Sequence, residues 1–362
     1  MNNFGPIRGL NLAGSIVAVI DSIVVSVIVS VGFGSIASAQ EGKQEIKLLI
    51  NSPDEPLVKQ MSIARTADFL DHQARAWTQV RKCGTCHTNF PYLIARGQLG
   101  GDLTALNEVR GFFERKIANW DSGKKEDLPK RDTEVIATAA TLALQDGLTT
   151  GKLHPLTRKA LDRMWTLQQA NGAWDWLKCG WPPLEHDDYY GVVYVAVAVG
   201  HAPDNYAETA QAKKGLDGFR RFFKNNPPPS LHHKAMLLWA SQRVDGVMSD
   251  KLKKSTIQEL RAIQKSDGGW SLPMLGDWVG YDERPNDRSA GSDGYATGLV
   301  VYVLRQAGVP AKDEAIQKGV AWLKSNQRES GRWFTKSINT DRYHFITHAG
   351  TAYAVLALKA CE

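Results

Sequence analysis

The chain has 362 residues, of which 43% are apolar, so it is long enough to bury a large hydrophobic core. Its formal net charge is +6, but it has no dense run of Lys and Arg interleaved with aromatic residues, so we do not expect nucleic-acid binding. Its four cysteines are too few for a scaffold held together by disulfides.

The first segment has the features of an export signal. Arg8 precedes a mostly apolar stretch, residues 10–33, and small residues at 37–39 form a small-x-small cleavage site. We expect removal of residues 1–39, so that the mature chain begins at Gln40. It would then work in the periplasm or on the outer side of the inner membrane, where membrane contact is possible. An uncleaved anchor is the alternative, although Asp21 weakens a membrane-spanning helix.

Residues 40–58 are charged and contain two prolines, which indicates a linker. From residue 59 to residue 362 helical patterns alternate with loops. Charged helices, expected on the outside, cover residues 59–80, 104–120, 155–169, 205–224, 249–265 and 313–326. Apolar helices rich in small residues are expected on the inside. The first begins near residue 92, and the others cover residues 132–145, 187–200, 230–243, 293–306 and 344–359.

Three of these helix pairs share the signature Gln-x-x-x-Gly-x-Trp between the charged and the apolar helix. The copies are Gln168/Gly172/Trp174, Gln264/Gly268/Trp270 and Gln327/Gly331/Trp333. The glycine lets the chain turn, the tryptophan covers the end of the hairpin, and the glutamine amide can bond freed backbone groups. A repeat at this spacing predicts an all-α repeat fold, and about six hairpins predict a closed α/α toroid forming one domain over residues 59–362.

The antiparallel arrangement of the hairpins has a functional consequence. Every connection from an outer to an inner helix lies at the same end of the ring. The unusual loops therefore gather at one mouth, although they are far apart in the sequence. We expect any functional site there.

The signature, the hairpin number and the composition of the apolar helices resemble those of the terpenoid cyclase and protein prenyltransferase toroids, squalene–hopene cyclases most of all. The resemblance covers most of the mature chain and implies a ring that binds an apolar, isoprenoid-like small molecule. The same ring also hosts lyases and complement-type domains, so the fold does not determine the reaction. A full squalene cyclase has two barrels, whereas the mature chain is about one toroid long.

The first loop of the expected mouth contains Cys83-Gly84-Thr85-Cys86-His87, the attachment pattern of c-type haem. The two thiols can bond the two vinyl groups, and His87 is placed for the proximal axial position. Export favours haem, because this attachment is made outside the cytoplasm. A short disulfide, or half of a zinc site completed by Cys179 and a distant histidine, are the alternatives. The candidates for the distal ligand are His344, His348, His232 and His233.

An acidic cluster, Glu185, Asp187 and Asp188, lies at the start of the apolar helix of residues 187–200. Class II terpene cyclases carry Asp-x-Asp-Asp at such a place, so the resemblance implies that Asp187 protonates an alkene, although Glu185 departs from the pattern. Crowding by Glu185 and Asp188 predicts a raised pKa for Asp187. Aromatic rings that could face a carbocation are those of Trp176, Trp181, Tyr189 and Tyr190. Ordinary helix capping by Asp187 is the alternative.

Asp293 and His348 match two of three positions at which protein prenyltransferases hold zinc, and Tyr295 stands at the cysteine position. With only two of the three ligands, we do not expect zinc. Capping by Asp293 and a hydrogen-bonded His348 explain these residues equally well.

Three functions are open. We expect an exported terpene cyclase-like protein that carries covalent haem and binds or transforms an isoprenoid-like ligand. As an enzyme it would be a cyclase or mutase of the isomerase class using Asp187, or a haem-dependent oxidoreductase. The alternatives are a haem-dependent redox or sensing protein on a non-cyclase toroid, which needs both thiols and His87 and would have a redox partner, and a binding scaffold without chemistry.

Overall fold

The computed structural model describes residues 48–280 and 283–362; the expected export signal and residues 40–47 of the expected linker lie outside the described residues. Glu45–Glu362 form one compact unit. Within the described residues every regular element is helical and no β-strand is formed. The all-α prediction is therefore confirmed.

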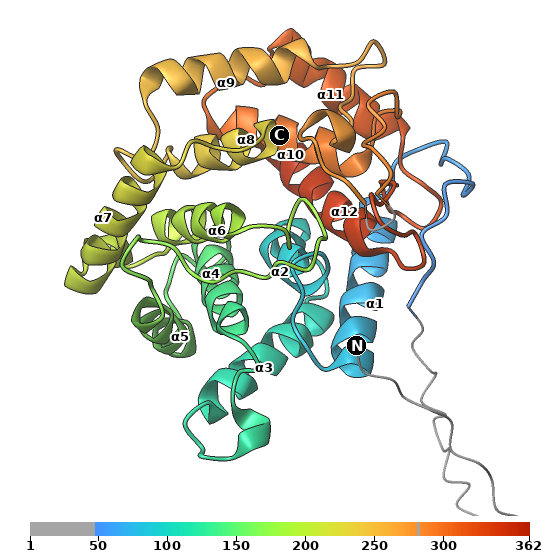
Figure 1. The fold of residues 1–362 in the computed structure, drawn as a ribbon. Helices are drawn as coiled ribbons and strands as arrows, with labels where there is room; N and C mark the ends of the chain where they lie inside the picture. The colour runs from blue at the N-terminus through green and yellow to red at the C-terminus, as the bar shows by residue number, and fades with distance from the viewer. Residues whose placement is uncertain (1–47, 281–282) are drawn as a thin grey trace, which may run out of the picture. The chain divides into compact units, whose positions relative to one another are not determined.

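The α-helices of the described chain alternate between an outer and an inner layer (Figure 1). The outer helices are α1 (Ile63–Arg81), α3 (Thr104–Asn119), α5 (Pro155–Thr166), α7 (Ala210–Asn225), α9 (Asp250–Ala262) and α11 (Glu314–Ser325). The inner helices are α2 (Asn89–Arg96), α4 (Asp132–Leu148), α6 (Asp188–His201), α8 (Leu231–Ala240), α10 (Gly294–Gln306) and α12 (Phe345–Lys359). Each predicted helix is present, with ends shifted by a few residues.

The inner helices form a closed ring. Each packs against the next, from α2 through α4, α6, α8 and α10 to α12, and α12 packs in turn against α2. Helix α1 also contacts α12, which joins the first and last hairpins. The predicted α/α toroid of six hairpins is confirmed for the described residues.

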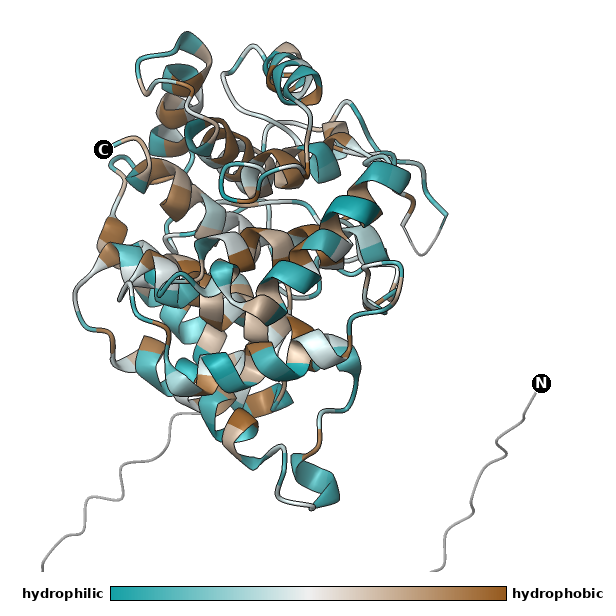
Figure 2. Ribbon diagram, turned by 90° about the vertical axis from the view of Figure 1, so that its left-hand side faces the viewer, coloured by the Kyte–Doolittle hydropathy of each residue, from teal (hydrophilic) through white to brown (hydrophobic). Residues whose placement is uncertain are grey.

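Burial follows the layers. The inner helices α6 and α12 are buried almost along their whole length, which explains why their sequences are mostly apolar on every side. Outer helices carry hydrophilic residues interspersed with hydrophobic ones, as Figure 2 shows on the faces turned to the viewer. Their apolar side chains cover the inner ring.

The three signature copies build the same structure three times. The glycine has a positive φ in each copy: 89° at Gly172, 91° at Gly268 and 92° at Gly331. The glutamine amide donates to that glycine's carbonyl and to a carbonyl of the next outer helix or its N-cap, and the tryptophan N–H donates back to the helix it follows. In the last copy the second acceptor is the carbonyl of Ser62, 3.0 Å from Gln327. This bond ties the last hairpin to α1 and closes the outer layer.

The centre of the ring is filled by side chains. Tyr190 and Tyr194 stack with their ring centroids 5.9 Å apart, and Tyr295 and Tyr353 meet edge to face at 5.4 Å. The cavity bounded by Cys86, Tyr190, Tyr194 and Tyr353 has a volume of about 10 Å³, which is about the space of one water molecule. An isoprenoid in the ring centre would have to displace these tyrosines.

Residues 48–58 lie along the last hairpin. The backbone N–H of Asn51 donates to Asp341 (3.1 Å) and that of Val58 donates to Gln327 (2.9 Å). The described part of the expected linker is therefore bound to the ring. In residues 48–280 and 283–362, each helix is too short or too polar to cross a bilayer.

Candidate functional site

The loops between outer and inner helices meet at one mouth of the ring, as the hairpin geometry predicts. The Asn339 side chain donates to the carbonyl of Gly180 (2.8 Å), and the His232 N–H donates to the carbonyl of Leu275 (2.8 Å). The rings of His87 and Trp181 are 6.5 Å apart. These contacts join the loops before α2, α6 and α12, and a pocket lined by both Asp187 and Leu275 adds the loop before α10 to the same rim.

The cysteine loop brings two free thiols to this rim. Cys83 is half-buried, Cys86 is buried, and neither forms a disulfide. Burial raises the pKa of both thiols, and the nearby carboxylate of Glu185 raises that of Cys86 further. Both cysteines are therefore protonated thiols at neutral pH, and the short-disulfide alternative is absent from this structure.

His87 lies in a cage of aromatic rings beside the thiols. Its ring centroid is 4.6 Å from that of Phe345 and 5.3 Å from that of Trp77. Its Nδ1 is 3.1 Å from the hydroxyl of Thr88. Burial lowers the pKa of His87 to about 3, so the imidazole is neutral and able to ligate a metal through Nε2.

Two further histidines lie behind Thr88. The Thr88 hydroxyl is also 3.3 Å from Nε2 of His344, and the rings of His344 and His348 are 5.3 Å apart. Nε2 of His348 donates to the carbonyl of Leu70, and Nδ1 of both histidines is buried without a partner. Burial lowers the pKa of His344 well below its usual value and that of His348 to about 4. His87, His344 and His348 thus form a cluster of neutral imidazoles.

The acidic cluster is divided among three partners. Glu185 lies against the thiol of Cys86, Asp187 binds His233, and Asp188 binds Lys178 at 2.6 Å. Asp187 also accepts the N–H of Tyr190 and so caps α6. Burial alone raises the pKa of Asp187, but the hydrogen bond and charge of His233 outweigh it and leave the pKa below its usual value. The predicted raised pKa of Asp187 is wrong, because its carboxylate neighbours are engaged elsewhere and its closest partner is a histidine.

The four aromatic residues of this segment do not converge on one site. Trp181 lies beside His87, and Tyr190 points into the ring centre against His232. Tyr189 packs edge-on against His233, with ring centroids 5.2 Å apart. Trp176 is buried against Tyr190 and donates to the carbonyl of Leu184. They do not form a common wall for a carbocation.

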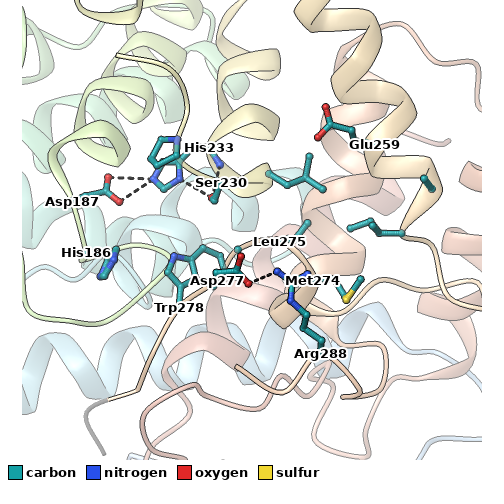
Figure 3. Close-up of a pocket in the computed structure, with 15 residues that line it drawn as sticks. His186, Asp187, Ser230, His233, Glu259, Met274, Leu275, Asp277, Trp278 and Arg288 are labelled. Atoms are coloured by element: carbon teal, nitrogen blue, oxygen red, sulfur yellow. Dashed lines mark hydrogen bonds and ion pairs between the residues drawn. The ribbon is translucent and has the colours of Figure 1, made fainter. Parts of the chain in front are cut away.

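Beside Asp187 the rim opens into a pocket of about 460 Å³, drawn in Figure 3. Asp187, His233 and Ser230 lie in a row on one side of it. Nε2 of His233 is 3.2 Å from the Asp187 carboxylate, and Nδ1 is 2.7 Å from Oγ of Ser230. Apolar lining comes from Ile263, Met274, Leu275 and Trp278, and charged lining from Glu259, Asp277 and Arg288.

The half-matched zinc positions are occupied by other interactions. Asp293 caps α10 and accepts hydrogen bonds from Leu272 and Thr335, and burial raises its pKa to about 6. Tyr295 donates to or accepts from His232 at 2.9 Å. Within the described residues, no group of three or more His, Cys, Asp or Glu side chains is placed to hold a metal ion.

Sequence reasoning missed two relationships at this rim. The contact of Glu185 with Cys86 joins two loops. Neither the cysteine motif nor the acidic cluster contains a sequence signal that predicts this contact. The row Ser230–His233–Asp187 had a signal, because Ser230 and His233 are three residues apart at the start of a helix. Asp187 starts the neighbouring inner helix at the same rim, so ring order could have indicated the contact.

Comparison with known proteins gives a partial match. A family model described as the squalene–hopene cyclase C-terminal domain matches residues 232–347, which include Asp293 but neither the cysteine loop nor Asp187. The squalene–hopene cyclase of Zymomonas mobilis is 29% identical over 143 residues. That alignment covers 37% of this chain and 19% of the cyclase, so the chain spans about a fifth of this relative.

Solved structures with a similar arrangement include two terpene cyclases. The ent-copalyl diphosphate synthase from Streptomyces platensis has a TM-score of 0.48 and 15% identity, covering 75% of this chain and 50% of its own. A variant of the type II terpene cyclase MstE from Scytonema, in complex with geranylgeranyl dihydroxybenzoate, has a TM-score of 0.45 and 11% identity, covering 83% and 98%. The family match and the closed helical ring support the expected likeness to the terpenoid cyclase toroids.

Proposed function

We propose that this chain is an exported c-type haem protein built on a terpene cyclase-like toroid. Haem would be attached through Cys83 and Cys86, with His87 as the proximal ligand. The observation that carries the proposal is geometric: His87 and both free thiols lie in the same loop, and Nδ1 of His87 is engaged by Thr88. The contact of Nδ1 with the Thr88 hydroxyl orients the ring and leaves Nε2 as the nitrogen that would ligate the iron.

The donor set fits haem c, while the space requires movement of the rim. The cavity beside His87 has a volume of about 20 Å³ and is lined mainly by apolar side chains, among them Trp181, Leu184, Ile338 and Phe345. Most of these belong to irregular segments before α6 and α12. To hold a haem, the Trp181 and Ile338 segments would have to move away from His87.

The bound group would supply one-electron transfer, and the chain would set its environment. For the distal position we propose His344, which would have to leave the Thr88 hydroxyl and move to the Nε2 side of His87, because Thr88 contacts His87 at Nδ1. A redox partner would meet the haem at this rim. Attachment outside the cytoplasm agrees with the export signal expected in residues 1–39, and contact with the outer side of the inner membrane is part of the proposal.

The proposal is tested by expressing the full chain with a c-type maturation system and recording the visible spectrum of the purified protein. We expect a Soret band that is lost in Cys83→Ala and in Cys86→Ala. Cys361→Ala, which changes a half-buried cysteine far from the rim loop, is the matched control and should keep the band. A colourless wild-type protein would overturn the proposal.

A second candidate function is the binding or conversion of an isoprenoid-like ligand in the pocket beside Asp187. It is favoured by the pocket's volume of about 460 Å³ and by the apolar Met274, Leu275 and Trp278 in its lining. The lowered pKa of Asp187 makes it a carboxylate rather than a proton donor in this state. Incubation with squalene or polyprenyl alcohols tests it: a cyclised product that disappears in Asp187→Asn would support it, and the absence of any product would exclude it.

A further inference from the structure

We propose that Ser230, His233 and Asp187 form an ester-hydrolysing site in the pocket between α6, α8 and the loop before α10. This site is separate from the cysteine loop and does not depend on haem. It goes beyond the proposed redox function.

The three side chains form one hydrogen-bonded row. The Ser230 hydroxyl is 2.7 Å from Nδ1 of His233, and the Asp187 carboxylate is 3.2 Å from Nε2 on the opposite side of the ring. The carboxylate holds the proton on Nε2, so Nδ1 is the free acceptor that faces the hydroxyl. Either imidazole nitrogen can act as base when a carboxylate orients the other one.

The row is held rigidly. His233 is 1% exposed and its ring stands at 88° to that of Tyr189, 5.2 Å away. The Asp187 carboxylate is also fixed by the N–H of Tyr190. Ser230 and Asp187 remain partly exposed and line the pocket, so a ligand can reach the hydroxyl.

Helix capping does not account for the whole arrangement. Ser249 caps α9 in the same way that Ser230 caps α8, with its hydroxyl accepting the N–H of Leu252 at 3.3 Å. Ser62 and Thr209 cap α1 and α7 likewise. Within the described residues, Ser230 is the capping hydroxyl with a bond to an imidazole, and that imidazole is bonded to a carboxylate.

The surroundings indicate an uncharged ester with an apolar part. Met274, Leu275 and Trp278 offer an apolar wall, and the Asp187 carboxylate beside the reacting row would repel an anionic substrate. Glu259 is paired with Lys234 and Asp277 with Arg288, so these two carboxylates add little net charge to the pocket. The backbone N–H groups of His232 and His233 are bonded to the Leu275 carbonyl and the Ser230 hydroxyl, so at the start of the ten-residue helix α8 the helix dipole favours the negative charge that develops on the carbonyl oxygen.

The reaction balances with water as the second reactant. Oγ of Ser230 bonds to the ester carbonyl carbon as its proton passes to Nδ1 of His233, and the ester C–O bond breaks as the alcohol leaves with that proton. Water then attacks the acyl group, gives one proton to His233, and releases the acid as Ser230 recovers its hydrogen. Asp187 stays ionised and stabilises the protonated ring.

The test uses the purified mature chain with a fluorophosphonate probe and with p-nitrophenyl butyrate. We expect the probe on the peptide containing Ser230, and we expect Ser230→Ala to lower kcat/KM by at least about 100-fold. Ser249→Ala removes an equivalent cap without an imidazole and should leave labelling and hydrolysis unchanged. Its melting temperature, compared with that of Ser230→Ala, separates loss of a cap from loss of a nucleophile.

His233→Gln provides the second arm, because it leaves the Ser230 hydroxyl in place. We expect it to lose labelling while the protein keeps its far-UV circular dichroism and, if haem is attached, its Soret band. Equal labelling of Ser230 in His233→Gln and wild type, or no labelling of wild type, would overturn the proposal.

Discussion

The carboxylate of Glu185 lies against the thiol of Cys86 and raises the pKa of that thiol. One residue belongs to the expected haem motif and the other to the acidic cluster, about a hundred positions later in the chain. The contact shows that the mouth of the ring is one connected site rather than a set of separate loops. It also removes Glu185 from the neighbourhood of Asp187.

Replacing Glu185 should reveal this contact through the pH dependence of stability. Burial raises the pKa of Glu185, so its ionised form is disfavoured in the folded protein. Wild type should therefore gain stability as the pH falls through the raised folded pKa toward the unfolded value near 4.5. Glu185→Gln lacks this gain. Urea midpoints from pH 8 to pH 4.5 measure it, and parallel curves for the two proteins would contradict the account.

His348 should make the opposite contribution at acidic pH. Its folded pKa, about 4, lies below the ordinary 6.5, so its stabilising effect is complete above pH 6.5 and is lost as the pH falls toward 4. The loss should be on the order of 3 kcal/mol in the free energy of unfolding. His348→Gln should make the free energy of unfolding less dependent on pH between pH 6.5 and pH 4. An unchanged slope in the variant would show that His348 is not held neutral.

The glycines test the repeat geometry. Gly331 has φ of 92°, and a Cβ there would lie 2.2 Å from the backbone carbonyl of Arg65. Gly308 has φ of 82° with open space around it, so it is the matched control. Gly308→Ala should cost about 1–2 kcal/mol from the left-handed backbone alone. Gly331→Ala should cost about 2–5 kcal/mol because overpacking is added. Equal urea midpoints would contradict the packing of this turn on α1.

The proposed distal ligand, His344, can be tested through the spin state of the haem iron. In haem-loaded protein, His344→Ala should change the spectrum from six-coordinate low-spin to high-spin, because the second nitrogen ligand is lost. His348→Ala is the control, since its Nε2 is bonded to the carbonyl of Leu70. Electron paramagnetic resonance distinguishes the two spin states. A low-spin signal in His344→Ala would exclude His344 as the ligand.

The fold was predictable because its information is local and repeated. Gln327, Gly331 and Trp333 bond to each other and to the adjoining helices, so a short signature specifies each hairpin end. Inner helices such as α6 are apolar on every side, and no periodicity indicates which residues face the centre. The inward position of Tyr190 and the filled ring centre were therefore hidden from the sequence.

The site was predictable in its location but not in its pairings. Ring order places Cys86, Asp187 and His344 at the same mouth, and the structure agrees. The pKa of Asp187 was predicted in the wrong direction, because Glu185 and Asp188 are its neighbours in sequence while His233 is its neighbour in space. Long-range partners of charged groups depend on loop conformations that single motifs do not specify.

The proposed function depends on covalent haem at Cys83 and Cys86. The mass of the denatured full chain, after expression with a c-type maturation system, shows whether haem is attached. We expect a mass increase of one haem, confined to the peptide that contains both cysteines and His87. A denatured chain with unmodified Cys83 and Cys86 would contradict it.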